Sequence, residues 1–215
     1  MTKPIKIDFV SDIACPWCVV GLRGLEAALD RVGDLVEADI RFQPFELNPD
    51  MPPEGQNIVE HVAQKYGATR EQSDANRLAI RDRAAAVGFT MAMDENSRIY
   101  NTFDAHRLLH WAGLVGDQTA LKHALFEANF TDNDSPAEHE VLVRAAMKAG
   151  LDPHAALEVL TSGAYAKEVR EAQAQWRAAG INAGPAVIIN DRHLISGGQP
   201  AEYFEQALRQ IATEA

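Results

Sequence analysis

Apolar and polar residues alternate near the N-terminus in a pattern that is typical of β-strands. Ile5, Ile7 and Phe9 alternate with charged residues, and residues 36–42 repeat this pattern. Between the two stretches, leucine and valine recur at every third or fourth position as far as Gly33. A period of two predicts a half-buried strand, and a period of three to four predicts an amphipathic helix. The chain therefore opens with a predicted β-α-β unit.

Helical patterns follow in the middle of the chain, with start signals that are typical of helix N-termini. Thr69 with Gln72 and Ser135 with Glu138 have the spacing of capping boxes, in which side chains satisfy free N–H groups of the first turn. Asp152-Pro153 predicts another helix start. A further helix is predicted from an apolar stripe that ends before Gly180 and consists of Tyr165, Val169, Ala172 and Trp176.

Strand patterns return towards the C-terminal end. Ala186–Ile189 is a short apolar strand, and a turn at 190–192 leads to a second strand at His193–Ser196. A final amphipathic helix is predicted from Pro200 onward, with Tyr203, Phe204, Ala207, Leu208 and Ile211 on its apolar face. We therefore expect an α/β protein in which residues 1–48 and 181–215 form one domain and residues 49–180 form an α-helical insertion that includes the helix leading back.

Composition and charge narrow the classes of function. With 215 residues, the chain can bury a core without disulfide staples. A formal net charge of −11 and the lack of a Lys/Arg cluster argue against binding to nucleic acid. The sequence has no apolar run of membrane-spanning length and no signal-peptide pattern at its start. We expect a cytoplasmic protein with no membrane partner, whereas the oligomeric state is left open.

The two cysteines of the chain stand where the first strand gives way to the first helix. Free N–H groups and the helix dipole favour a thiolate at Cys15, and Pro16 suits a first turn that needs no N–H from it. Cys18 lies one turn further on and is expected to be the more buried thiol. The pattern predicts dithiol-disulfide exchange, in which Cys15 attacks a substrate disulfide and Cys18 then displaces the substrate.

Two other interpretations of the cysteines compete with this chemistry. Buried, reduced cysteines can pack as small hydrophobic residues. A metal site would need further ligands, for which His106 and His110 have helical spacing but no acidic companion. The position of the pair and the intervening proline favour redox chemistry, without a metal or an organic cofactor. Trp17 is either a landing surface for substrate beside Cys15 or a half-exposed ring at the helix start.

Several segments resemble the DsbA-like thioredoxin-fold oxidoreductases, in particular the cytoplasmic FrnE-like branch associated with polyketide-biosynthesis disulfide isomerases. They are Asp8–Asp12 leading into Cys-Pro-Trp-Cys, Asn101–Leu108, Gly184-Pro185 before the apolar strand, and Ser196–Gln199. The resemblance spans nearly the whole chain. It implies a thioredoxin-like fold, β-α-β … β-β-α, with a large α-helical insertion domain.

The resemblance also implies residue roles around the cysteine pair. It places Pro16, Trp17, Gly184 and Pro185 in the substrate-binding site, with Pro185 as a cis-proline whose preceding residue pairs with a substrate strand. Gly184 stands where relatives often carry Val or Thr. The glycine would loosen substrate binding or widen the range of substrates that the site accepts. His106 and Arg107 lie in a helix bordering the cleft, where a packing role is as compatible with the sequence as a catalytic one.

Two alternative functions stay open. The related 2-hydroxychromene-2-carboxylate isomerases and kappa-class glutathione transferases have the same helical insertion, but they typically place Ser where Cys15 stands. The cysteine pair therefore argues against their chemistry, although glutathione remains a candidate co-substrate. The other alternative is a redox-responsive adaptor that holds a client protein. The expected partners are protein or small-molecule thiols and disulfides, and a reducing cytosol favours a net reductase or isomerase.

Overall fold

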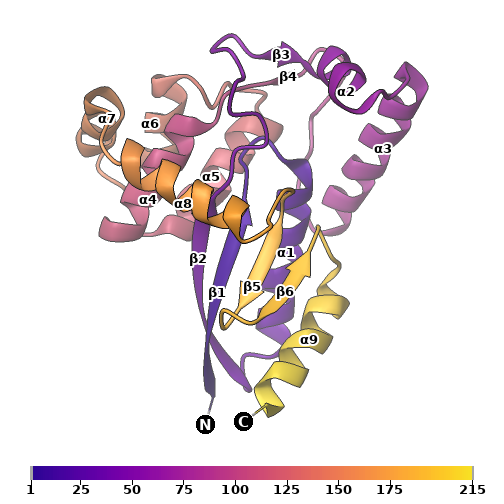
Figure 1. Cartoon of the computed structure of the whole chain (residues 1–215), viewed down its shortest axis with the longest axis vertical. Coiled ribbons are helices and arrows are strands. Elements are labelled where there is room, and N and C mark those ends of the chain that lie inside the picture. The colour runs from indigo at the N-terminus through magenta and orange to yellow at the C-terminus, as the bar shows by residue number, and fades with distance from the viewer. Residues whose placement is uncertain (1, 215) are drawn as a thin grey trace.

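The computed structural model describes residues 2–214. Its central sheet contains both parallel and antiparallel strand pairs (Figure 1). Its strand order is β2-β1-β5-β6. Strand β1 (Lys3–Ser11) pairs in parallel with β2 (Val36–Pro44) and antiparallel with β5 (Ala186–Ile189). Strand β6 (His193–Ser196) forms the edge beside β5. This arrangement confirms the predicted α/β class and the order of the sheet-forming segments.

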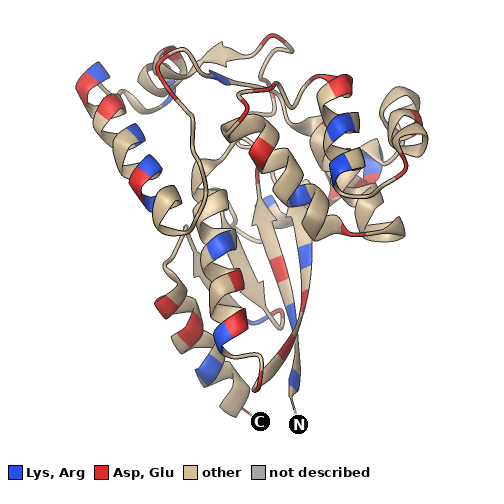
Figure 2. Ribbon diagram, turned by 180° about the vertical axis from the view of Figure 1, so that it is seen from behind, with Lys and Arg blue, Asp and Glu red and all other residues tan. Residues whose placement is uncertain are grey.

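Helices α1 (Pro16–Arg31) and α9 (Ala201–Thr213) pack together on one face of the sheet. Figure 2 shows this face towards the viewer, with acidic and basic residues interspersed along both helices. Apolar side chains fill the space between these helices and the strands, and Phe9, Leu22 and Phe204 have no exposed surface. Burial of this apolar area from water is the main force that holds the two helices on the sheet.

The middle of the chain forms a helical layer across one end of the sheet (Figure 1). Its helices are α2 (Ile58–Tyr66), α3 (Arg70–Ala86), α4 (Phe103–Val115), α5 (Gln118–Phe130), α6 (His139–Lys148), α7 (Pro153–Ser162) and α8 (Ala166–Ala178). A small antiparallel ribbon joins β3 (Gln56–Asn57) to β4 (Arg98–Ile99). Helices α4, α5 and α8 contact β2, and α3 contacts α1. The sheet therefore has helices on both sides of the end at which β1 finishes.

One buried apolar cluster runs from the sheet into the helical layer, since it includes Leu22 of α1 together with Leu108 of α4 and Leu125 of α5. The division into residues 1–48 with 181–215 and 49–180 stays a prediction, and residues 1 and 215 lie outside the described part. No helix within residues 2–214 combines the length and the apolar character that crossing a membrane requires.

The helix starts confirm some of the expected caps and correct others. Thr69 and Gln72 exchange both hydrogen bonds of a capping box, at 2.9 and 3.2 Å, and Asp152 caps α7 by accepting from the His154 N–H at 2.8 Å. The box predicted at Ser135 and Glu138 is wrong. The Ser135 hydroxyl instead accepts from Ala137 N–H within a turn, so that α6 begins only at His139.

Two tyrosines that the sequence places on the apolar faces of helices do not lie on those faces. Tyr165 precedes α8 as its N-cap, with a φ of 62°. Tyr203 is 51% exposed, because the buried side of α9 is formed by Phe204, Leu208 and Ile211. Pro200 is the N-cap of α9 and not a residue of its first turn. These helices are thus present where the sequence predicts them, with ends displaced by one residue or one turn. The β3–β4 ribbon inside the predicted helical block was not predicted.

Glycine allows α1 to lie close to the segment that leads into α9. A Cβ atom on Gly24 would stand 2.7 Å from the carbonyl oxygen of Gln199, which is backbone and has little freedom to move away. Gly24→Ala is therefore expected to lower the free energy of unfolding by about 1–3 kcal/mol, measured by denaturant titration. Gly33→Ala is the control, since its nearest contact would be an ordinary 3.6 Å. Equal losses in the two variants would contradict the close-approach explanation.

Candidate active site

The cysteine pair lies at the start of α1, as the sequence predicts. Strand β1 ends at Ser11, and Cys15 is the N-cap residue of α1, with extended backbone and no side-chain capping bond. Pro16 follows in the first turn, and the Cys18 N–H donates to the Cys15 carbonyl oxygen at 3.0 Å. The Cys15 thiol therefore stands where free N–H groups of a helix favour an anion.

Gly184 and Pro185 face the cysteines from the start of β5. The Cys15 thiol donates to the Gly184 carbonyl oxygen at 3.5 Å, and a Cβ atom on Gly184 would lie 3.3 Å from the Cys18 sulfur. The Gly184–Pro185 peptide is cis, as the resemblance implies. The structure thus brings together Cys15, Cys18, Gly184 and Pro185 from two segments far apart in the sequence.

The two thiols differ in their surroundings. Cys18 has no exposed surface, and Cys15 is 4% exposed. Burial raises the pKa of Cys18 well above its ordinary value, and the neighbouring Cys15 raises it further. The charge of Lys122 and the Asp12 N–H act in the opposite direction. Cys18 is the more buried thiol, as the sequence predicts, and it needs help to become a thiolate.

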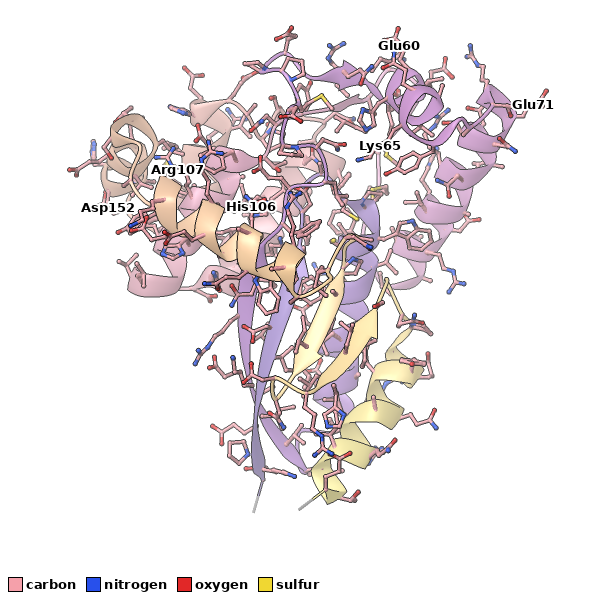
Figure 3. The ribbon with its side chains drawn as sticks, viewed as in Figure 1. Glu60, Lys65, Glu71, His106, Arg107 and Asp152 are labelled. Atoms are coloured by element: carbon pink, nitrogen blue, oxygen red, sulfur yellow. The ribbon has the colours of Figure 1, made fainter. Side chains whose placement is uncertain are left out.

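A cleft of about 540 Å³ opens beside Cys15. Ala14, Cys15, Pro16 and Trp17 line one wall, and Trp17 is half-buried there. The facing walls come from α2, α3, the β3–β4 segment and the end of α5, and include Tyr66, Arg77, Arg98, Tyr100, Asn129 and Phe130. Lys65, labelled in Figure 3, ties α2 to the loop after β2 by donating to the Leu47 carbonyl oxygen at 2.9 Å.

A buried carboxylate fixes the loop between β1 and Cys15. Asp12 accepts hydrogen bonds from the Thr102 hydroxyl and the Leu47 N–H, both at 2.7 Å. The His106 Nε2 atom lies 3.4 Å from the carboxylate, off the line of a hydrogen bond, so that this contact is electrostatic. Burial acts to raise the pKa of Asp12, but His106 and the hydrogen bonds outweigh it and leave the pKa below 3.8. Asp12 is therefore ionised and joins α4 to the active-site loop.

Asp12→Asn is expected to lower the free energy of unfolding by about 1–3 kcal/mol at pH 7, because an amide cannot accept from all of these donors. The pKa of Asp12 is depressed in the folded state, so the carboxylate stabilises the fold above its unfolded pKa. The difference between the two proteins should shrink as the pH falls through the folded pKa. Denaturant titrations at several pH values check this, and a difference that grows in acid would contradict it.

His106 and Arg107 have different surroundings although they are adjacent in α4 (Figure 3). His106 faces Asp12 and so reaches the active-site loop. Arg107 instead donates to the Ala164 carbonyl oxygen at 2.8 Å and to carbonyl groups at the end of α7, which is a packing and capping role. The ring of His110 packs against Tyr165 at 5.1 Å between centroids.

Sequence reasoning missed two ionisable residues near the cysteines. Lys122 of α5 is 1% exposed, and its position four residues before Phe126, on the buried side of the helix, was the available signal. Tyr66 ends α2 and is 65% exposed, and partial desolvation together with the charge of Cys15 raises its pKa. No local pattern places Tyr66 near Cys15, because the two are joined only by the packing of α2 over the cleft.

Comparison with known proteins agrees with this geometry. The model of the family described as DSBA-like thioredoxin domain matches residues 6–209. The chain superimposes on a probable DsbA oxidoreductase from Streptomyces coelicolor with a TM-score of 0.91 and 35% identity, over 98% of this chain and 91% of the other. It is 25% identical to the uncharacterized protein YwbO of Bacillus subtilis (strain 168), over 97% of this chain and 96% of that protein.

A more distant structural likeness concerns the fold alone. A 2-hydroxychromene-2-carboxylate isomerase superimposes with a TM-score of 0.70 at 17% identity, over 96% of this chain and 95% of the other. The strand order of the sheet and the helices between β2 and β5 are consistent with this likeness and with the thioredoxin-like fold that the sequence predicts.

Proposed function

The chain belongs to the family of DSBA-like thioredoxin domain proteins, and on this premise we propose that it exchanges disulfides through Cys15 and Cys18. The observation that carries the proposal is the placement of Cys15 at the N-cap of α1, with Cys18 buried one turn further on. Cys15 is the nucleophile and Cys18 the resolving thiol. The Cys-Pro-Trp-Cys motif and Asn101–Leu108 support the FrnE-like branch of the family.

The proposed cycle moves two electrons from the cysteines to a substrate disulfide. The Cys15 thiolate attacks one substrate sulfur, the substrate S–S bond breaks, and the other substrate half leaves as a thiolate. The Cys18 thiolate then attacks the Cys15 sulfur, which releases the second half and forms the Cys15–Cys18 disulfide. In the mixed disulfide, Cys15 has no thiol proton and no longer donates a hydrogen bond to the Gly184 carbonyl oxygen. That oxygen can then accept a hydrogen bond from a substrate N–H.

The cleft supports a substrate that enters the molecule. Cys15 is 4% exposed and lines the cleft, so a substrate sulfur must approach through it. A volume of about 540 Å³ is in the range of small-molecule sites. We therefore favour small disulfides, or disulfides in flexible peptide segments, over those inside folded proteins. Trp17 would contact the substrate from the wall beside Cys15. Glutathione, a small thiol, is a suitable co-substrate for a site of this size.

The proposed compartment is the cytoplasm, where the thiol pool is reducing. Reducing conditions regenerate the dithiol form of the pair after each turnover. We therefore expect net reduction or isomerisation of substrate disulfides and not net oxidation.

A comparison of two substrates tests the function and the substrate class together. Reduction of bis(2-hydroxyethyl) disulfide and of folded insulin is followed with glutathione, glutathione reductase and NADPH. For each substrate, the rate with the protein is divided by the rate without it. We expect this acceleration to be larger for the small disulfide than for insulin. Equal acceleration of both would contradict the substrate class. Absence of any acceleration would contradict the function. Conjugation or isomerisation that is retained in Cys18→Ala, together with saturable glutathione binding, would favour a glutathione-dependent isomerase or transferase.

A further inference from the structure

A lysine lies buried near the cysteine pair. Lys122 of α5 is 1% exposed, and its Nζ atom stands 4.8 Å from the centre of the Phe126 ring and 5.7 Å from that of Phe42. Aromatic faces attract a cation, but less strongly than a carboxylate does. In the described part of the chain, no ion pair joins Lys122 to a carboxylate, whereas most other lysines there form one at the surface.

The burial of this ammonium disfavours the folded state. Burial lowers the pKa of Lys122 to about 8, although the charges of Cys18, Asp12 and Cys15 act to keep the proton on it. An apolar side chain of similar length would fill the same space between the two rings without this penalty. Stability of the fold therefore does not explain a lysine here, and buried ionisable groups of this kind concentrate at functional sites.

Cys18 is the group near Lys122 whose ionised form a positive charge would stabilise. The Cys18 sulfur faces the Asp12 N–H, the Asp12 carboxylate lies 3.4 Å from His106, and His106 lines a small cavity together with Lys122. Of the three charges that keep the proton on Lys122, that of Cys18 acts most strongly. Cys18 in turn is fully buried and has a raised pKa, and Lys122 is the charged side chain that lowers it. The resolving step needs Cys18 as a thiolate in a place where water cannot solvate it. An ammonium nearby supplies the missing stabilisation.

The surroundings of Lys122 allow the ammonium to keep some hydration. A cavity of about 30 Å³ lies between α4, the end of β2 and Lys122, and it has room for one water molecule. His106 and His110 of α4 line it together with Gln43. The titratable groups around Lys122 are thus these two histidines, which line the cavity with it, and Asp12, Cys15 and Cys18, whose charges act on it.

We propose that Lys122 is a positioning residue for the resolving step, in which its ammonium stabilises the Cys18 thiolate during attack on the mixed disulfide. The role rests on the proposed function. The Cys18 proton passes to solvent, the new bond forms between the Cys18 and Cys15 sulfurs, and the substrate thiolate leaves. Lys122 changes neither its bonds nor its proton count in this step, and acts on the charge of Cys18 alone.

A single-turnover experiment separates the two steps. The fully reduced protein reacts with excess 4,4′-dithiodipyridine, an uncharged disulfide whose halves absorb when released. The first half is released when Cys15 attacks and the second when Cys18 resolves. In Lys122→Met at pH 7, we expect the first phase to stay within about twofold and the second to slow by about tenfold or more, because each unit of pKa removes tenfold of the thiolate. Lys167→Met, at an exposed position of α8, is the matched control and should leave both phases unchanged.

Thermal unfolding distinguishes this role from a structural one. Lys122→Met should melt at the same temperature as the unmodified protein or higher at pH 7. Because the pKa of Lys122 is lower in the folded state than its ordinary 10.5, the unmodified protein gains stability as the pH rises from about 8 towards 10.5. The advantage of the variant should therefore shrink over this range.

The results that would overturn the role are specific. An unchanged second phase in Lys122→Met would exclude it, and so would a lower melting temperature with both phases slowed alike. Absence of both phases in the unmodified protein would overturn the proposed function, and this role with it.

Discussion

Cys15→Ser is expected to lower kcat/KM for disulfide reduction by about a thousandfold or more, since a serine hydroxyl does not form a mixed disulfide and is not ionised at neutral pH. Serine has nearly the same shape, and its hydroxyl can donate to the Gly184 carbonyl oxygen as the thiol does. The free energy of unfolding should therefore change little. The measurement is reduction of bis(2-hydroxyethyl) disulfide coupled to glutathione reductase.

The control for this variant is Ser11→Ala, which changes a buried side chain at the end of β1 and leaves both cysteines in place. It should retain most of the activity. Cys15→Ser protein that turns over at a rate close to that of the control would show that another group is the nucleophile.

Cys18→Ala is expected to stop the cycle after its first step and to leave half of the substrate bound covalently to Cys15. Without the resolving thiol, only an external thiol can release that half, so the mixed disulfide accumulates. Mass spectrometry of the intact protein after reaction with 4,4′-dithiodipyridine should find one thiopyridine group per chain. A peptide digest should place the group on Cys15.

Excess dithiothreitol should remove this group, which distinguishes a disulfide from irreversible modification. The double variant Cys15→Ser, Cys18→Ala is the matched control and should carry no group. A group that appears on the double variant, or a Cys18→Ala protein that turns over as fast as the unmodified one, would contradict the assigned roles.

The sequence predicts the sheet and the cysteine helix because their signals are local. Alternation in 5–9 and the three-to-four spacing up to Gly33 depend only on which side chains face the core, and the structure has β1 and α1 there. The start of α6 was predicted wrongly for a local reason as well. Ser135 satisfies a neighbouring N–H in a turn as readily as in a cap, and the sequence does not decide between the two.

The surroundings of the cysteines could be predicted only in part. The Cys-Pro-Trp-Cys motif and Gly184-Pro185 were identified by their resemblance to a family, and the structure brings them together. The burial of Lys122 could not be predicted in this way. Lysine on a helix is ordinarily exposed, and the residue spacing in α5 alone does not show that the side of the helix carrying Lys122 is covered. Its burial follows from the packing of α5 against β2, which is a tertiary contact.

The most direct measurement is a redox titration of the cysteine pair in glutathione buffers, read by alkylation of the free thiols and mass spectrometry. If Cys15 and Cys18 form one active disulfide, both thiols become protected together in a single two-electron transition. Thiols that remain alkylated at every glutathione ratio, or that are lost independently of each other, would contradict dithiol-disulfide exchange at this site.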